Sequence, residues 1–247
     1  MNNYVVIIPA RASSTRLPNK PLLLLNGQSL LSRVHALAKK SDALEVYIAT
    51  DCEDIKNHAE EFGAKVVMTS QDHISGTDRL AEAATTLKLE PNQVILNLQG
   101  DEPFMPIEIM NSLPQYVGPE SPIATACVPI TAIEDIESPN EVKVVRTLTN
   151  RAMYFSRSII PNAFTTEFHG YLKHLGIYAY SNDTLQSITN LPESEIELQE
   201  KLEQLRFLDH GYNIHVQDFD IEPPIGIDTQ ADLDKANEIL IAYEKAQ

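Results

Sequence analysis

The sequence predicts an α/β protein built on a doubly wound, mostly parallel sheet. Two observations lead to this prediction: short, continuous apolar runs recur through the first half of the chain, and amphipathic segments separate them. Continuous apolar runs are typical of strands buried on both faces, and their alternation with helices over short connections favours parallel pairing. A chain of 247 residues can bury a sizeable core of this kind.

Four strands and three helices are expected in the first half. The apolar runs predict strands at 4–8, 45–50, 65–69 and 93–99, and the amphipathic segments predict helices at 29–40, 51–62 and from 76 onward. Leu30, Val34 and Leu37 share one helix face, and Ser29 is a residue type that caps helix N-termini. Asp51 is expected to cap the second helix in the same way.

The second half is less regular. We expect strands at 122–130, 142–148, 171–180 and 213–219, and helices at 194–209 and 230–246. The 194–209 helix rests on Leu198, Leu202 and Leu205, which recur at helical spacing, whereas 151–170 has no clean period and is expected to form loops. We interpret 1–247 as a single domain, with about 130–180 as an inserted lobe.

The charge distribution restricts the kinds of ligand. The net charge is −16 with a pI near 4.8, which disfavours a general nucleic-acid binder. Residues 1–41 nevertheless carry six lysines and arginines and no acidic residue. A positive region in an acidic protein suits a small polyanion better than a polymer. The two cysteines follow no disulfide-scaffold spacing, and no secretory signal or membrane span is recognised, so a cytoplasmic location is expected.

Three of these cations fall in one segment, IPARASSTRLPNKPL, which directly follows the first strand. Arg11 and Arg16 can each fork onto phosphate or carboxylate oxygens, and Lys20 can act as a point charge. The alternative is that all three are solvated surface cations. Their place at the carboxyl end of a strand, where doubly wound sheets bind ligands, favours the binding role. Phosphate-loop glycine motifs are absent from this segment.

Two aspartates are candidate ligands for Mg²⁺, which prefers carboxylate oxygens. Asp101 follows the fourth strand in LQGDEP, and Asp228 precedes the last helix in GIDT. Each could instead serve only as a turn or cap residue. SGTDR places Gly76 and Thr77 at a helix start whose free N–H groups could face a nucleotide. Histidine spacing supports no metal cluster, and the serines lack a nucleophile motif.

Together these segments resemble the 3-deoxy-manno-octulosonate cytidylyltransferase family, also called CMP-Kdo synthetases, over nearly the whole chain. The first half carries VVIIPARxxSTRLPxKPL, ATD at 49–51, SGTDRLAE at 75–82 and LNLQGDEP at 96–103. The second half carries VKVV at 142–145, YFSRSIIP at 154–161, KHLGIYAY at 173–180, KLEQLRFL at 201–208 and GIDTQADL at 226–233. The opening and QGDEP segments fit several sugar nucleotidyltransferases, whereas FSRSIIP, HLGIYAY and LEQLR are far narrower.

The resemblance implies a Rossmann-like sheet of the nucleotidyltransferase type, in which 130–180 binds the sugar and forms dimer contacts. It implies that CTP and a 3-deoxy-octulosonic acid (Kdo) give CMP-Kdo and pyrophosphate, with Mg²⁺ as cofactor, for lipopolysaccharide synthesis. A cytoplasmic homodimer with no nucleic-acid or membrane partner is implied as well. The implied catalytic residues are Arg11, Lys20 and Asp101; the nucleotide would contact Arg11, Lys20, Ser75, Gly76 and Arg79; the sugar acid would contact Arg16, Gln99, Arg157, His174, Tyr178, Glu203 and Gln204; and the metal would bind Asp101 and Asp228.

One departure from the family pattern is visible: Asn19 stands where the loop usually has glycine. Asparagine tolerates a positive φ better than other non-glycine residues, so the turn is expected to form. Two alternatives stay open: a related enzyme that acts on 8-amino-Kdo or a sialic-type acid, and a non-catalytic nucleotide-binding protein. A dinucleotide-dependent oxidoreductase would require the GxGxxG motif that this sequence lacks.

Overall fold

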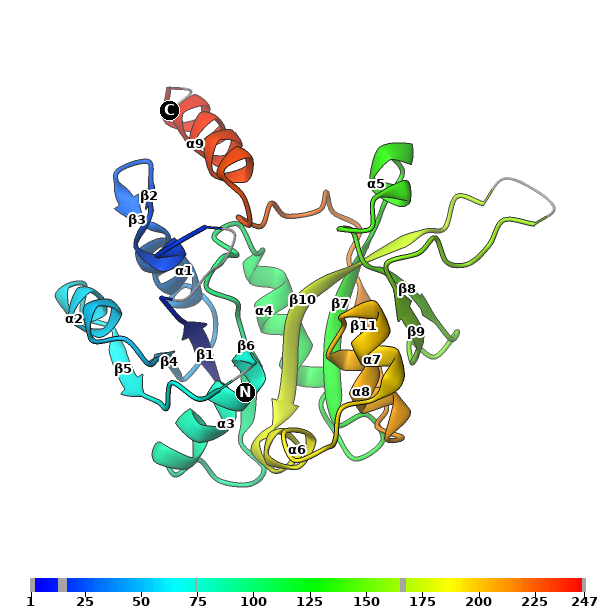
Figure 1. Ribbon diagram of the computed structural model, residues 1–247, viewed down its shortest axis with the longest axis horizontal. Helices are drawn as coiled ribbons and strands as arrows, with labels where there is room; N and C mark the ends of the chain where they lie inside the picture. The colour runs from blue at the N-terminus through cyan, green and yellow to red at the C-terminus, as the bar shows by residue number, and fades with distance from the viewer. Residues whose placement is uncertain (1–2, 13–16, 74, 165–167, 246–247) are drawn as a thin grey trace.

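The computed structural model describes residues 3–12, 17–73, 75–164 and 168–245, with only the backbone described over 242–245. Figure 1 shows a central sheet with helices on both faces. The strands of the main sheet follow the order β11-β7-β10-β6-β1-β4-β5, and β8 pairs with β10 and β9. The predicted doubly wound architecture is therefore correct.

The strands are β1 (Tyr4–Ala10), β2 (Leu24–Leu25), β3 (Gln28–Ser29), β4 (Glu45–Thr50), β5 (Lys65–Met68), β6 (Val94–Asn97), β7 (Ile123–Pro129), β8 (Lys143–Arg146), β9 (Ala152–Ser156), β10 (Leu172–Ser181) and β11 (Ile214–Asp218). The α-helices are α1 (Leu30–Ala38), α2 (Glu53–Glu61), α3 (Gly76–Thr86), α4 (Ile107–Ser112), α5 (Ile133–Glu137), α6 (Asn182–Ile188), α7 (Glu195–Glu200), α8 (Gln204–Asp209) and α9 (Gln230–Lys245). Two 3₁₀ turns, η1 (Lys20–Leu22) and η2 (Leu113–Tyr116), complete the set.

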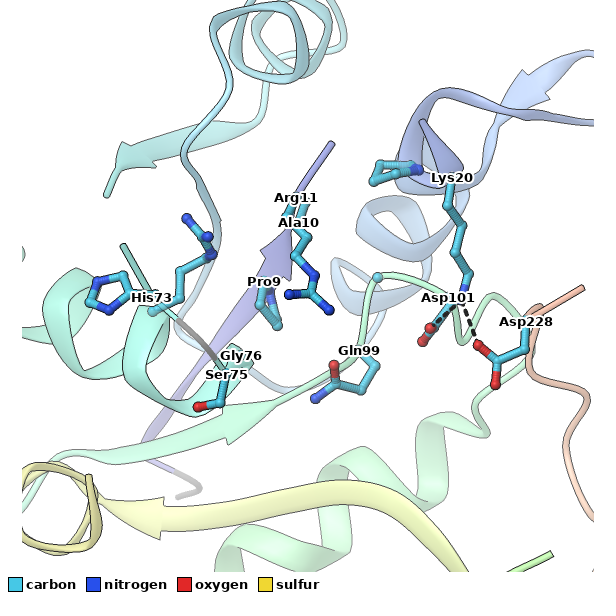
Figure 2. Close-up of a pocket in the computed structure, with 13 residues that line it drawn as sticks. Pro9, Ala10, Arg11, Lys20, His73, Ser75, Gly76, Gln99, Asp101 and Asp228 are labelled. Atoms are coloured by element: carbon cyan, nitrogen blue, oxygen red, sulfur yellow. Dashed lines mark hydrogen bonds and ion pairs between the residues drawn. The ribbon is translucent and has the colours of Figure 1, made fainter. Parts of the chain in front are cut away.

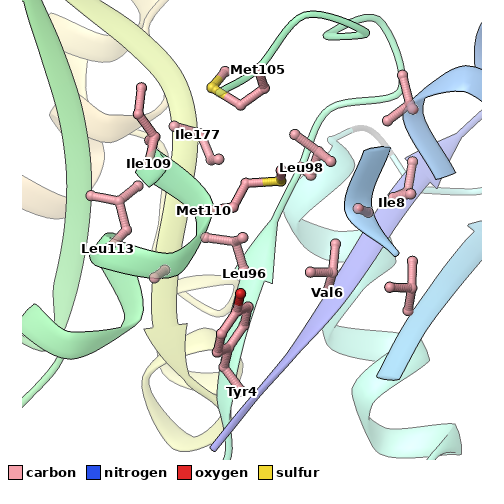
Figure 3. Close-up of a cluster of buried hydrophobic side chains, with 14 of the residues drawn as sticks. Tyr4, Val6, Ile8, Leu96, Leu98, Met105, Ile109, Met110, Leu113 and Ile177 are labelled. Atoms are coloured by element: carbon pink, nitrogen blue, oxygen red, sulfur yellow. The ribbon is translucent and has the colours of Figure 1, made fainter. Parts of the chain in front are cut away.

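Strand β1 lies between β4 and β6 and is parallel to both. Its side chains alternate between two cores because successive residues of a strand point to opposite faces. Tyr4, Val6 and Ile8 enter one core (Figure 3), and Val5 and Ile7 enter the other. This is why a continuous apolar run, rather than an alternating one, encodes the strand.

The helices divide between the two faces. The face of Figure 3 is covered by α1, α2 and α4, and the opposite face by α3, α6 and α8. Strand β10 runs antiparallel to both β6 and β7, whereas β11 is parallel to β7. Since β1, β4 and β6 are parallel, their carboxyl ends meet at one edge of the sheet, and the loops that follow them converge there.

Three local expectations were wrong. Asp51 does not cap α2, because Cys52 occupies the N-cap position and the Asp51 carboxylate pairs with Arg79. The region expected to form only loops contains β9, which pairs with β8. The helix expected at 194–209 is two helices, since Lys201 adopts a left-handed φ of 56° and ends α7.

An ion pair between Glu197 and Arg206 joins α7 to α8 across the break. Nε and Nη2 of Arg206 donate to the two carboxylate oxygens of Glu197 at 2.7 and 2.6 Å. Lys201 N and Leu202 N both donate to the carbonyl of Glu197, which closes the turn. Consequently α8 turns back toward the sheet and brings its first residues inward.

Segment 130–180 contributes β8, β9 and β10 to the main sheet, and Val144, Ala152 and Phe155 are buried in the second core.

The C-terminal helix α9 packs beside the β2–β3 hairpin, where Asn26 N donates to the Asn237 side chain at 2.7 Å. None of the helices described in the structure is long and apolar enough to cross a membrane.

Candidate active site

A pocket of about 240 Å³ opens at the sheet edge where β1 and β6 end (Figure 2). Its walls come from the end of β1, from η1, from the start of α3, from the loop after β6 and from the segment before α9. It is lined by Pro9, Ala10, Arg11, Lys20, Pro21, His73, Ser75, Gly76, Arg79, Gln99, Gly100, Asp101 and Asp228. The pocket thus gathers most of the residues expected to meet the triphosphate and metal.

Lys20 joins the two candidate metal ligands. Its Nζ lies 2.6 Å from Oδ2 of Asp101 and 2.9 Å from Oδ1 of Asp228, as the dashed lines in Figure 2 show. The Lys20 side chain is only 12% exposed. Burial alone would lower the pKa of its ammonium, but the two aspartates raise it above its ordinary value. Lys20 is therefore held as a cation at the pocket wall.

The loop places Lys20 through a left-handed turn at Asn19, whose φ is 52° and ψ is 30°. The carbonyl of Asn19 accepts a hydrogen bond from Leu22 N at 2.9 Å, and Pro21 supplies a preset φ to the 3₁₀ turn. The expectation that asparagine would support this turn is confirmed. Ser29 caps α1 as predicted, since its side chain accepts from Ser32 N.

Asp228 is anchored by its neighbours. Ile227 N donates to the carbonyl of Asp101 at 2.9 Å, which holds the C-terminal segment against the loop after β6. The Asp232 carboxylate accepts from the backbone N–H groups of Asp228 and Thr229. Two segments 127 residues apart in the sequence therefore present their carboxylates to one point.

The donor set fits a magnesium ion. Mg²⁺ is commonly held by one or two carboxylates, while waters and substrate phosphates complete its shell. Asp101 and Asp228 supply two carboxylates at the pocket wall. Among the described residues no cluster of three metal-ligating side chains occurs, so the remaining ligands would come from solvent and substrate.

Glu102 adjoins this pair, and its carboxyl oxygen Oε2 is buried. Burial, followed by the charge of Asp101, raises the pKa of its carboxyl to about 8. Its Oε2 has no hydrogen-bond partner among the described residues. A Cβ at Gly226 would approach Glu102 Oε1 to 3.0 Å, so the glycine leaves room for this carboxyl under the site.

The opposite wall suits an anion. Arg11 extends its guanidinium into the pocket toward Gln99 (Figure 2). Ser75 caps α3 in a reciprocal capping box with Asp78, and Ser75 and Gly76 line the pocket. The N-terminus of an eleven-residue helix presents free N–H groups and a positive dipole end to this space.

Two further side chains at this wall are held by neighbours. Arg79 is 2% exposed, and its guanidinium donates to Asp51 at 2.7 Å and to the Thr69 hydroxyl. His73 also lines the pocket and bonds Glu82. Sequence reasoning assigned no site role to His73, because an isolated histidine outside any ligand spacing carries no signal.

The residues expected around the sugar acid are spread more widely. Gln99 lines the pocket and donates to Asn97 Oδ1 at 3.0 Å, and Tyr178 is paired with Asn97 in the sheet. The Tyr178 hydroxyl is buried without a hydrogen-bond partner among the described residues. Glu203 and Gln204 begin α8, and Arg16 lies outside the described residues.

His174 and Arg157 have structural partners and do not line the pocket. His174 is buried, its Nε2 lies 3.0 Å from the Thr125 hydroxyl, and burial lowers its pKa to about 3, so the ring is neutral. The Arg157 guanidinium donates to the carbonyl oxygens of Glu200 and Pro139 at 2.7 and 2.9 Å.

Comparisons with known proteins show which family this chain resembles. A family model described as Cytidylyltransferase matches residues 5–215. A relative from Idiomarina loihiensis is 43% identical, covering 96% of this chain and 98% of the relative. A relative from Francisella tularensis subsp. holarctica is also 43% identical, covering 97% and 99%. Both are named 3-deoxy-manno-octulosonate cytidylyltransferase.

Similar solved structures belong to the same class of enzyme as these relatives. CMP:2-keto-3-deoxy-manno-octonic acid synthetase in complex with CTP matches with a TM-score of 0.91 and 42% identity, over 97% of this chain and 99% of that one. A cytidylyltransferase from Leptospira borgpetersenii matches with a TM-score of 0.58 and 16% identity, over 98% and 95% of the two chains, and so shares the fold. The α/β nucleotidyltransferase fold is thereby confirmed.

Proposed function

The chain belongs to the 3-deoxy-manno-octulosonate cytidylyltransferase family, and from that premise we propose how its pocket joins CTP to a sugar acid. It is a nucleotidyltransferase enzyme. In the reaction, the anomeric hydroxyl of Kdo attacks the α-phosphorus of CTP, the bond from that phosphorus to the pyrophosphate oxygen breaks, and CMP-Kdo and pyrophosphate form. The product serves lipopolysaccharide synthesis.

The observation that carries the residue assignment is the position of Lys20 beside Asp101 and Asp228, in the pocket that Arg11 and the start of α3 line. This arrangement places cationic side chains and a pair of carboxylates in one pocket. A nucleoside triphosphate with its metal needs both, because phosphoryl transfer accumulates negative charge on the phosphate oxygens and the leaving pyrophosphate. We assign catalytic roles to Arg11, Lys20 and Asp101.

On the nucleotide side, Arg11 and Lys20 bind the triphosphate, and Ser75 and Gly76 offer the helix N-terminus to its anionic oxygens. Arg79 forms the floor of this side, where its pairing with Asp51 holds the guanidinium in place. Asp101 and Asp228 would hold Mg²⁺. When bound, the ion supplies charge neutralisation at the phosphates and lowers the pKa of a coordinated hydroxyl.

The sugar acid would lie between the pocket and β10. Gln99 reaches it from the pocket wall. The buried Tyr178 hydroxyl, which has no hydrogen-bond partner in the part of the chain that the structure describes, is a polar group that a sugar can satisfy. Glu203 and Gln204 contact its hydroxyl groups from α8. His174, which is neutral, contributes a hydrogen bond rather than a charge, so the sugar carboxylate depends on arginines, Arg157 and Arg16.

We assign 130–180 to sugar binding and to contact with a second copy of this chain. Phe164 is 90% exposed and Ile133 is 64% exposed. An apolar pocket of about 300 Å³, lined in part by Ile133 and Phe168, lies in the same segment. Large exposed apolar side chains that gather in one region are typical of an interface.

The location of the protein in the cytoplasm also stays a prediction.

Pyrophosphate release is the decisive measurement for this function. The protein is assayed with CTP and Mg²⁺ against Kdo, 8-amino-Kdo and a sialic acid, and with Kdo against ATP, GTP and UTP. We expect the highest kcat/KM for CTP with Kdo. Absence of release with CTP and Kdo would overturn the proposed substrate, and release with another acid would identify the related enzyme. A non-catalytic nucleotide-binding protein would bind CTP and turn over none of the acids.

A further inference from the structure

A group of buried polar side chains lies behind the pocket, between α3, β6, β10 and α8. Thr77, Asn97 and Tyr180 are buried members of this group. Buried polar groups are stable where they are hydrogen-bonded. The connections among them show how the nucleotide wall and α8 are joined.

The central connection is the bond between Thr77 and Glu203. Thr77 Oγ1 donates to Glu203 Oε2 at 2.5 Å, across 126 residues of sequence. Thr77 follows Ser75 and Gly76 directly, so the same turn of α3 lines the pocket with its first two residues and holds Glu203 with its third.

A second series of hydrogen bonds runs from the pocket wall through β6 toward Glu203. Gln99 Nε2 donates to Asn97 Oδ1, and Asn97 Nδ2 donates to the Tyr180 hydroxyl, both at 3.0 Å. Tyr180 adjoins Glu203 and Thr77, since both enter its electrostatic surroundings. The Thr77–Glu203 bond is thus part of a network with one end at the pocket wall and the other at α8.

We propose that Thr77 is a positioning residue that couples the two substrate subsites, because its hydroxyl holds the Glu203 carboxylate while its own helix turn forms part of the nucleotide wall. This inference rests on the proposed function, in which Glu203 contacts the sugar acid. Thr77 itself is not among the residues that line the pocket. The Thr77–Glu203 hydrogen bond joins the helix turn of the nucleotide wall directly to the sugar subsite.

The chemistry requires a hydroxyl at position 77. A carboxylate accepts hydrogen bonds and donates none, so it needs a donor, and a threonine hydroxyl has one proton to give. Valine has the same shape as threonine without that proton, whereas serine keeps the proton and loses a methyl group. Comparing Thr77→Val with Thr77→Ser therefore separates the hydrogen bond from the packing.

The test measures each substrate separately. We expect Thr77→Val to reduce kcat/KM for Kdo by about tenfold, the scale of one hydrogen bond to a charged group. The Kd of CTP, titrated without the sugar acid, should stay within about twofold of wild type, because Thr77 does not contact the nucleotide. Thr77→Ser, which keeps the hydroxyl proton, should restore kcat/KM for Kdo to about the wild-type value.

A double-mutant cycle tests the assigned partner. Because Thr77 acts through Glu203, the double variant Thr77→Val/Glu203→Ala, in which the accepting carboxylate is absent, should lose no more kcat/KM for Kdo than Glu203→Ala alone. Additive losses would overturn the proposal, as would an equal weakening of CTP and Kdo binding in Thr77→Val. Thr85→Val, which removes a hydroxyl bonded within the same helix, is the matched control and should behave as wild type.

Failure of the proposed function can be distinguished from failure of the Thr77–Glu203 coupling. If wild type releases no pyrophosphate with CTP and Kdo, the substrate assignment fails, and the Thr77–Glu203 coupling is then measured from urea unfolding of the same four proteins. If wild type is active but neither kcat/KM nor urea unfolding shows coupling between Thr77 and Glu203, the inference is overturned while the proposed function stands. Should Thr77→Val not fold, Thr77→Ala removes the same proton with less crowding and takes its place in the cycle.

Discussion

The side-chain ammonium of Lys20 lies 2.6 Å from Oδ2 of Asp101, although 81 residues separate them in the sequence. The bond joins the cationic loop after β1 to the acidic loop after β6 at the edge where both parallel strands end. The contact with the aspartates explains locally why Lys20, a cation of the positively charged N-terminal region, lies in an acidic protein. The cation is positioned by carboxylates of the same site and stays at the pocket wall, where a triphosphate can reach it.

Removal of the Asp101 carboxylate should abolish most of the rate. We expect Asp101→Ala to lower kcat by about a hundredfold or more, the scale seen when a major electrostatic stabiliser is lost. CTP binding should weaken far less, since Arg11 and the α3 N-terminus are unchanged. Asp234→Ala, at an exposed acidic residue of α9, is the control. Equal loss of CTP affinity and of rate would contradict a catalytic role for Asp101.

Lys20→Met should affect stability as well as activity. Without the ammonium, Asp101 and Asp228 lose the cation that they share, so the melting temperature should fall by a few degrees. Added Mg²⁺ should recover more of the melting temperature in the variant than in wild type, because the ammonium no longer competes with the ion for the two carboxylates. Thermal unfolding with and without Mg²⁺ measures this. Equal Mg²⁺ shifts in the two proteins would contradict the prediction.

The parts of the site that follow strands could be predicted from the sequence. In a parallel sheet the carboxyl ends share an edge, so residues directly after apolar runs, such as Arg11 and Asp101, are expected at one place. Asn19 could be interpreted in the same local way, because its turn depends on its own φ. These inferences need no knowledge of which strands are neighbours.

Long-range pairings could not be predicted in this way. Nothing local places β10 antiparallel between β6 and β7, and therefore nothing local brings Tyr178 beside Asn97. The apolar spacing across 194–209 predicts one helix, and the turn at Lys201 depends on the Glu197–Arg206 pair, which forms only after the chain folds back.

Asn19 provides a stability prediction for the opening loop. Its left-handed φ of 52° favours glycine or asparagine over residues with an ordinary side chain. Asn19→Ala should therefore reduce the free energy of unfolding by about 1 kcal/mol, whereas Asn19→Gly should change it by only a few tenths. Urea unfolding of the three proteins measures the difference. If alanine and glycine had the same effect, backbone strain at this turn would be excluded as the reason for asparagine.

The proposed dimer contact can be tested at Phe164. A charged residue in an apolar interface leaves a desolvated charge, so Phe164→Asp should shift the protein from dimer to monomer. Sedimentation velocity at micromolar concentration measures the two species. Leu44→Asp is the control, because Leu44 is exposed apolar surface outside 130–180. A wild-type protein that sediments as a monomer would refute the contact, and so would a Phe164→Asp variant that stays dimeric.

His174 should make the folded protein sensitive to acid. Burial lowers its pKa from 6.5 to about 3, so between these values the unfolded chain binds a proton that the folded chain does not. Stability from this group is complete above about pH 6.5 and falls as the pH falls toward 3, by up to roughly 4–5 kcal/mol. His174→Gln removes the titrating ring, so its free energy of unfolding should depend less steeply on pH across this window, whatever its value at pH 7. Urea unfolding of both proteins at several pH values measures the two slopes. Parallel pH profiles would mean that the His174 ring takes up its proton at the same pH in the folded and the unfolded chain, which would contradict the lowered pKa.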